Sequence, residues 1–169
     1  MSTKRIIGAA ASATAVVSGS TAIAFVNSNK YGDFYWYSVD GKEKGGKSRK
    51  YIGNDLSEIK KLLKELTDIK QYRSALKANL KTMKKTHLTN LTGADVDASK
   101  EDSNSKLDAF ANYINKWCET LALKSVENSK KSEDEKWDES KFVNNEGTEW
   151  KAFNDQCTIG EEQLPALNA

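Results

Sequence analysis

The chain has 169 residues, and 26 Lys and Arg against 24 Asp and Glu give it a formal net charge of +2. Its two cysteines and one histidine cannot fill the four ligand positions of a structural zinc site. About 143 residues follow a first apolar segment, which is enough for one domain with a single hydrophobic core.

The first segment is apolar. Residues 6–26 hold no charge and follow the basic pair Lys4 and Arg5. As a helix they would span about 31 Å at about 1.5 Å per residue, close to the hydrocarbon thickness of a bilayer. The sequence therefore predicts a cytoplasmic stretch at 1–5 and a transmembrane anchor or signal peptide at 6–26.

The two alternatives for this segment place the rest of the chain on the same side of the membrane. We favour a single-pass anchor, because the apolar run is longer than the core of a usual signal peptide. The triplet that ends at Ala24 would instead allow cleavage after Ala24 and secretion. Because the basic residues stay in the cytoplasm, both alternatives place residues 27–169 outside the cell.

Residues 27–53 are rich in aromatic and basic side chains and are predicted to form a segment next to the membrane. The aromatic rings would lie at the bilayer interface, with the lysines near anionic headgroups. We favour this over stacking on a polyanion such as nucleic acid or a heparin-like chain. A short β-hairpin near 34–52, turning at Asp40-Gly41, is a further alternative. The candidate contacts to headgroups or a polyanion are Tyr35, Trp36, Tyr37, Lys42, Lys44, Lys47, Arg49 and Lys50.

Charge is distributed unevenly along the chain. Residues 27–106 carry 17 Lys and Arg against 11 Asp and Glu, whereas residues 107–169 carry 7 against 13. The two parts thus have net charges of +6 and −6. They could pack against each other, or the first part could present a face to a polyanion.

Residues 54–160 are predicted to form a helical extracellular domain, beginning with an amphipathic helix of roughly 30 residues at 55–85. Asp55 and Glu58 have the spacing of a capping box. The stripe could be a coiled-coil seam that lets the chain self-associate, with Arg73 setting the register. We favour the long helix of an intramolecular bundle. Its apolar stripe consists of Ile59, Leu62, Leu66, Ile69, Leu76, Leu80 and Met83.

The remaining elements follow from periodicity and turn residues. A polar loop is predicted at 92–105, and a second helix at 106–126 would pair antiparallel with the first. A short third helix is predicted around 137–143, and a last one begins near Thr148. An acidic tail follows at 161–169. The predicted face of the second helix is Leu107, Phe110, Ala111, Ile114, Trp117, Cys118 and Leu121. The fold class is therefore mainly α, a small antiparallel helical bundle behind the N-terminal segment.

Few residues suggest chemistry. In an exported chain Cys118 and Cys157 could form a disulfide, although two buried or surface thiols are the alternative. His87 follows two lysines at the end of a helix, where exposure is the usual state. The sequence holds no P-loop and no dinucleotide fingerprint. We therefore predict no enzyme, no metal and no cofactor.

The layout of the chain combines the apolar export segment, a Lys- and Asn-rich body, Trp117-Cys118 on one helix, and Trp150 with Cys157 near the end. In this layout the chain resembles the short paralogous, uncharacterised proteins of haemotropic mycoplasmas. The resemblance implies a membrane-associated or surface-exposed protein that contacts a host, and it transfers no catalytic residue.

The sequence thus favours a membrane-anchored or secreted binding module that contacts a host or envelope surface protein. A polyanion-binding protein and a self-associating coiled-coil protein are the alternatives. Nucleic acid is the less favoured partner.

Overall fold

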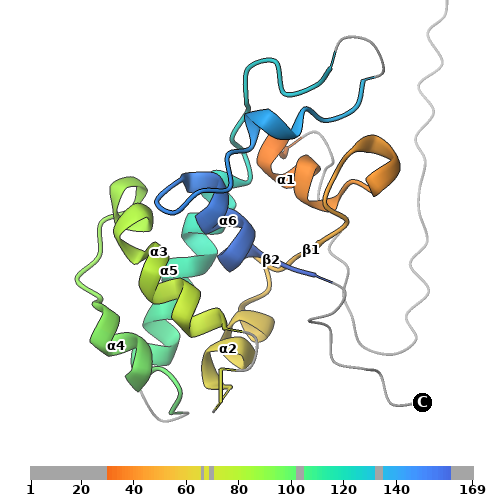
Figure 1. The fold of residues 1–169 in the computed structure, drawn as a ribbon. Coiled ribbons are helices and arrows are strands. Elements are labelled where there is room, and N and C mark those ends of the chain that lie inside the picture. The colour runs from red at the N-terminus through yellow and green to blue at the C-terminus, as the bar shows by residue number, and fades with distance from the viewer. Residues whose placement is uncertain (1–29, 66, 69–70, 102–104, 132–134, 161–169) are drawn as a thin grey trace, which may run out of the picture.

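The computed structural model describes residues 30–65, 67–68, 71–101, 105–131 and 135–160 (Figure 1). The apolar segment predicted at 6–26 and the tail predicted at 161–169 lie outside the described residues. Within the described ranges, no helix combines the length and the hydropathy needed to cross a membrane.

The described ranges are mainly helical, as predicted, with one small antiparallel sheet. The α-helices are α1 (Asp33–Val39), α2 (Leu56–Lys64), α3 (Tyr72–Thr86), α4 (Gly93–Ala98), α5 (Ser105–Leu121) and α6 (Glu149–Cys157). Two short 3-10 helices are η1 (Lys42–Lys44) and η2 (Glu139–Lys141), and the two strands are β1 (Lys50–Tyr51) and β2 (Thr158–Ile159).

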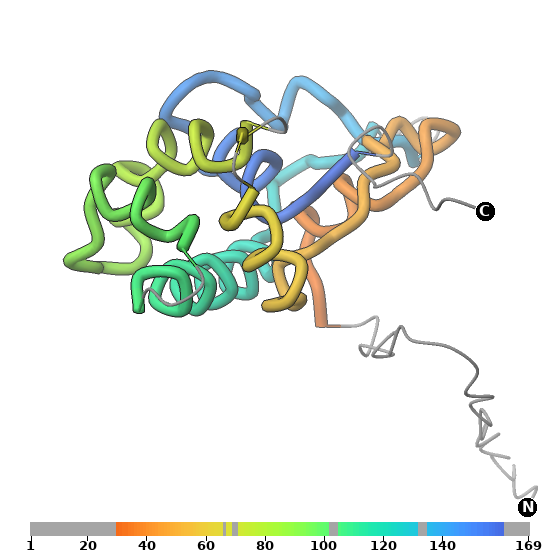
Figure 2. Tube along the Cα trace, turned by 90° about the horizontal axis from the view of Figure 1, so that it is seen from below, coloured from red at the N-terminus to blue at the C-terminus, as the bar shows by residue number. Residues whose placement is uncertain are grey.

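Helices α5 and α6 make most of the packing contacts between the helices. Helix α2 packs on α5, α3 packs on α6, and α6 also packs on α5. Figure 2 shows α5 along one side of the domain, with the segment around η2 on the opposite side. The predicted face of α5 is confirmed, because all seven of its members are buried. One continuous hydrophobic cluster joins these residues to the other helices.

The hairpin predicted near 34–52 is wrong. Residues 33–39 form α1, because Phe34, Tyr37 and Ser38 recur at helical spacing and this face is buried. Strand β1 does form, but it pairs with β2, with Lys50 opposite Ile159. Residues distant in sequence close this sheet, which is why the local turn signal at Asp40-Gly41 misled the prediction.

The predicted segment at 27–53 is not separate from the helical domain over its described part. Tyr31, Phe34, Tyr37 and Ile52 are buried in the same core as the helices. Phe34 contacts the rings of Phe142, Trp150 and Phe153, at centroid distances of 6.3, 5.3 and 5.6 Å. Tyr31, Phe34 and Tyr37 are therefore core residues rather than a belt among lipid headgroups, whereas Tyr35, Trp36 and Tyr51 are only partly buried.

The single helix predicted at 55–85 is also wrong, because the chain breaks between α2 and α3. Helix α2 ends at Lys64, and Asp68 and Gln71 then adopt positive φ angles of 48° and 53° before α3 begins. The Asp68 carboxylate then accepts hydrogen bonds from the backbone N–H groups of Arg73 and Ser74, at 2.9 and 3.0 Å. This satisfies donors at the start of α3 that have no partner within the helix.

The coiled-coil prediction fails with the long helix. Ile59, Leu62, Leu76, Leu80 and Met83, which were to form the seam, are at most 5% exposed within the domain. The seam is thus covered by this chain's own helices. Arg73, which was to set the register, is buried and bonds to the end of α2 instead.

Two shorter predictions also need correction. The loop predicted at 92–105 contains α4, which begins with a capping box in which Thr92 and Asp95 exchange hydrogen bonds, and Val96 is buried. The helix predicted around 137–143 is reduced to η2, and Trp137 instead pairs with Lys130 in an isolated β-bridge. The last helix is confirmed, since α6 begins directly after Thr148, whose side chain accepts a hydrogen bond from the Lys151 N–H.

Candidate functional site

A polar pocket of about 210 Å³ opens where β2 meets α2, α3 and α6. Its walls combine two cations and one carboxylate with apolar and hydroxyl groups. The lining residues are Arg49, Leu62, Gln71, Tyr72, Ala75, Lys151, Asp155, Thr158 and Ile159. Because four separate stretches of the chain contribute, the pocket exists only in the folded domain.

The antiparallel sheet places Arg49 in this pocket. Arg49 directly precedes β1, and the pairing of β1 with β2 brings it beside Thr158. Its Nε donates a hydrogen bond to Thr158 Oγ1 at 2.7 Å, and its Nη2 donates one to the Thr158 carbonyl at 3.2 Å. These hydrogen bonds hold the guanidinium in one orientation. Arg49 would therefore lose less conformational entropy on binding a ligand.

Helix α6 supplies the second cation and the carboxylate, one turn apart. Lys151 Nζ lies 2.7 Å from Asp155 Oδ2, and Asn79 Nδ2 of α3 donates to the same oxygen at 3.0 Å. Arg49 and Lys151 are thus the two cations of the lining, and Asp155 is its carboxylate. A carboxylate or phosphate group is the ligand chemistry that such a pair of cations favours.

Tyr72 is a buried residue of the pocket lining. Its hydroxyl donates a hydrogen bond to the Gln156 carbonyl at 2.8 Å. Burial raises the pKa of the Tyr72 phenol well above its ordinary value, with a further contribution from the charge of Glu58. The phenol is thus a neutral donor that fixes α3 against α6, and it does not act as an acid or a base near neutral pH.

The predicted headgroup or polyanion contacts do not gather into one face. Tyr37 is fully buried and cannot stack on a ligand. Lys47 forms an ion pair with Glu139 and lies 5.4 Å from the centre of the Tyr37 ring. Burial lowers the pKa of Lys47, but its hydrogen bond to Glu139 and its proximity to Tyr37 outweigh that effect, so the pKa is raised overall.

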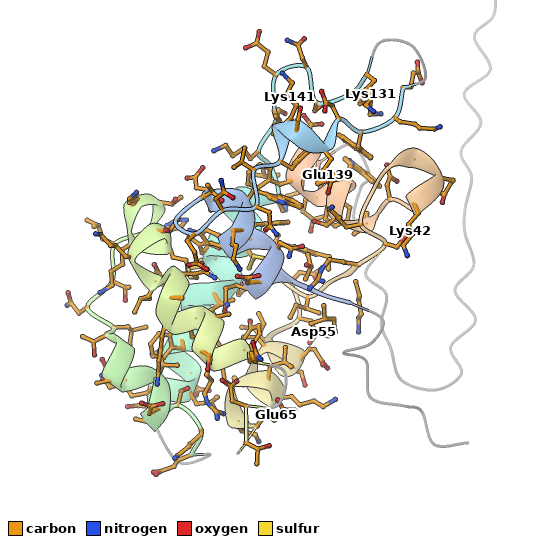
Figure 3. All side chains as sticks on the ribbon, in the orientation of Figure 1. Lys42, Asp55, Glu65, Lys131, Glu139 and Lys141 are labelled. Atoms are coloured by element: carbon orange, nitrogen blue, oxygen red, sulfur yellow. A yellow bond between two sulfur atoms is a disulfide. The ribbon has the colours of Figure 1, made fainter. Side chains whose placement is uncertain are left out.

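The other predicted contacts lie in different places. Lys44 pairs with Asp40 at 3.2 Å in η1, and Lys42 and Lys50 are exposed. Figure 3 shows Lys42 at the edge of the domain, on the far side from α3 and α4. Tyr35 and Trp36 are partly buried against the core. Of all eight predicted residues, only Arg49 lines the pocket.

Sequence reasoning missed the other polar residues of the pocket. Lys151 and Asp155 stand four residues apart on a predicted helix, a spacing that indicates an ion pair on one helix face. Nothing in the sequence places that face beside Arg49. That neighbourhood depends on the pairing of β1 with β2, which joins residues 109 positions apart.

The structure joins Cys118 of α5 to Cys157 at the end of α6 in a disulfide, with a Cα–Cα distance of 5.5 Å. Both cysteines are fully buried. Gly53 packs so closely that an added Cβ would lie 2.5 Å from the Cys118 Cβ. The two main helices of the core are therefore linked covalently next to β2 and the pocket.

No protein-family model, curated protein or solved structure matches the chain. The pocket therefore has to be interpreted from its own chemistry. In the described residues, no group of three or more His, Cys, Asp and Glu side chains could hold a metal ion.

The single histidine, His87, directly follows α3, at the opposite end of that helix from the pocket residues Tyr72 and Ala75. His87 Nε2 is 2.8 Å from Thr120 Oγ1, and the His87 carbonyl accepts a hydrogen bond from the Tyr113 hydroxyl at 2.9 Å. A hydroxyl partner does not orient an imidazole for proton transfer as a carboxylate does. His87 instead fixes the end of α3 to α5.

Proposed function

We propose that the chain is an exported binding module at the outer face of a cell membrane, and that its pocket takes an anionic group of its partner. The partner would be a surface molecule of a host or of the envelope. Residues 6–26 would hold the module at the membrane or, if cleaved after Ala24, release it.

The main support for export is the buried disulfide between Cys118 and Cys157. Disulfides persist in oxidising compartments outside the cytoplasm and are rare inside it. An uncharged run of 21 residues behind two basic residues gives an independent indication of export. The resemblance to surface proteins of haemotropic mycoplasmas supports the same location.

The observation that supports anion binding is the arrangement of Arg49 and Lys151 in one pocket. Arg49 is already oriented by Thr158, and Lys151 can exchange its contact with Asp155 for one with a ligand. Hydrogen bonds from such cations to carboxylate or phosphate oxygens are stronger than those between neutral groups. The proposal assigns no catalytic step to these residues.

Export is tested on intact cells with a protease and with a lysine-directed biotin reagent that does not cross membranes. We expect the domain to be labelled at its exposed lysines and cleaved without lysis of the cells. A cytoplasmic protein serves as the control for leakage. A domain that is protected until the cells are lysed would contradict export.

Anion binding is tested by titrating inorganic phosphate or acetate into the protein and following backbone amide resonances by NMR. We expect saturable shifts at Thr158 and Ala75, and a roughly tenfold weaker affinity in Lys151→Met because one charged hydrogen bond is lost. Lys81→Met removes an exposed lysine of α3 outside the pocket and should leave the affinity unchanged. Equal affinity in Lys151→Met and the wild type would contradict the proposed site.

A polyanion is the second candidate partner, favoured by the exposure of Lys42 and Lys50 on either side of Arg49. Attraction to a polyanion is sensitive to salt, because bound counterions are released. The double substitution Lys42→Glu and Lys50→Glu should lower the salt concentration at which the protein elutes from heparin. An unchanged elution position would remove this candidate.

A further inference from the structure

The first described residues are fixed against the C-terminal end of α5. The Gly32 N–H donates to the Ala122 carbonyl at 2.8 Å, and the Phe34 N–H donates to the Lys124 carbonyl at 3.2 Å. Lys30 Nζ lies 3.6 Å from a carboxylate oxygen of Glu119 on α5. The place where the N-terminal part of the chain joins the domain is therefore defined by the fold.

The connection from the apolar segment to this point is short. Residues 27–29 separate Val26, the last residue of the apolar run, from Lys30. Four Cα–Cα steps reach at most about 14 Å in an extended chain. If residues 6–26 span a bilayer, the surface around Lys30 stays within that distance of it, and the short tether keeps the local concentration of headgroups high.

Partly exposed aromatic side chains surround this point. Trp36 Nε1 donates a hydrogen bond to the Tyr31 carbonyl at 3.2 Å, which holds the indole beside Lys30. Tyr35 stacks on Tyr31 with 4.1 Å between ring centroids and contacts the Trp36 ring edge to face at 5.0 Å. Trp and Tyr are the residues that concentrate at membrane interfaces.

Helix α5 and the turn after it contribute an apolar and a basic residue on the same side. Leu123 directly follows Ala122, which binds Gly32, and it is 47% exposed. Lys116 is exposed on α5, one helical turn before Glu119, which faces Lys30. An exposed leucine next to lysines matches the composition of surfaces that lie on bilayers.

Two carboxylates at this place, Asp33 and Glu119, have hydrogen-bond partners, and the Asp33 carboxylate accepts a hydrogen bond from the Val126 N–H at 2.8 Å. Glu119 Oε1 accepts hydrogen bonds from the hydroxyls of Tyr51 at 2.7 Å and Tyr31 at 3.3 Å, and its other oxygen faces Lys30. Lys116 is exposed and adds a further positive charge. The surface is therefore not repelled by anionic headgroups.

We propose that Lys30, Tyr35, Trp36, Lys116 and Leu123 form a membrane-facing surface that rests on the headgroups of the bilayer holding the anchor. The proposal rests on the anchored form of the proposed function. It gives the domain a fixed orientation, in which the segment around η2 points away from the membrane, on the opposite side of the domain (Figure 2).

The distribution of tryptophans makes this orientation measurable. Trp117, Trp137 and Trp150 are at most 4% exposed, which leaves Trp36 as the accessible fluorophore of the four. The full chain is reconstituted in vesicles of phosphatidylcholine and phosphatidylglycerol that contain a lipid with a spin label on its headgroup. The spin label quenches fluorescence only over short distances, so it reports whether the indole lies among the headgroups.

We expect the labelled lipid to quench the wild type, and Trp36→Phe to lose most of that quenching. The double substitution Lys116→Glu and Leu123→Ser should also lose most of it, because the surface then lifts from the headgroups. Val143→Ser is the matched control, since Val143 is 48% exposed and follows η2. It should leave the quenching unchanged.

Flotation of the vesicles separates the two possible failures. Protein that floats with the vesicles but is quenched no more than Trp36→Phe overturns the membrane-facing surface and leaves the anchor intact. Protein absent from the floated fraction overturns the anchor and, with it, this inference.

Discussion

Arg73 Nη1 of α3 donates a hydrogen bond to the Leu63 carbonyl at 2.9 Å, and it also bonds to the Glu65 carbonyl. These carbonyls lie at the C-terminal end of α2, where the helix leaves its last acceptors without partners. A residue that interrupts an apolar stripe in the sequence thus joins two helices in the fold. Because the Arg73 side chain is buried, its hydrogen bonds to α2 contribute to the packing of the two helices.

Replacing Arg73 with Met should lower the free energy of unfolding by about 2–4 kcal/mol, because the buried Leu63 carbonyl and the partly buried Glu65 carbonyl lose their donor. Urea denaturation followed by circular dichroism measures the change. The control is Lys81→Met on the exposed side of the same helix, which should change stability by less than about 0.5 kcal/mol. Equal effects of the two substitutions would argue against the helix-capping role.

Opening the disulfide should destabilise the domain. Cys118 and Cys157 are 39 residues apart, and closing a loop of that length contributes about 4 kcal/mol in the chain-entropy account. The double substitution to Ser should lower the denaturation midpoint, and a reducing agent should lower the midpoint of the wild type but not of the variant. A wild-type protein indifferent to reductant would show that the thiols are not joined.

Phe34 distinguishes a core role from an interfacial one. Phe34→Ala removes a ring that contacts Phe142, Trp150 and Phe153, so it should cost about 3–5 kcal/mol of stability. Thermal or urea unfolding in the absence of lipid is the measurement, with the exposed Val143→Ala as control. A small loss of stability in the absence of lipid would instead favour a place for Phe34 at the membrane interface.

The tyrosines around Glu119 should make the domain sensitive to alkali. Burial, with the charge of and hydrogen bond to Glu119, raises the pKa of Tyr31 to about 12, and the same causes raise that of Tyr51. A phenol whose pKa is higher in the folded state than its ordinary value of 10.0 stabilises the fold below that pH. This stabilisation is lost as the pH rises through about 12.

Absorbance of tyrosinate during an alkaline titration checks this prediction. Glu119→Gln removes the negative charge, so Tyr31 and Tyr51 should ionise at lower pH than in the wild type. Glu127→Gln, on an exposed residue that does not contribute to either pKa, should leave the titration unchanged. An identical curve for Glu119→Gln would mean that burial alone sets both values.

Local patterns determined several elements from the sequence. The buried face of α5 and the start of α6 after Thr148 follow from helical periodicity and from a capping side chain, both of which act within a few residues. The mainly helical class follows for the same reason. The apolar segment at 6–26 stays a prediction of hydropathy.

Tertiary structure decided what local patterns leave open. The aromatic residues around Phe34 are of the types found in strands and at membrane interfaces. In the fold they form helix α1, and Phe34 packs in the core against Trp150 and Phe153. The break before α3 is stabilised by the hydrogen bond from Arg73 to the end of α2. The pocket needs Arg49 and Lys151, which stand about a hundred residues apart and meet only because β1 pairs with β2. Contacts between distant residues, whose energy appears only when the chain has folded, carry no signature in the neighbouring sequence.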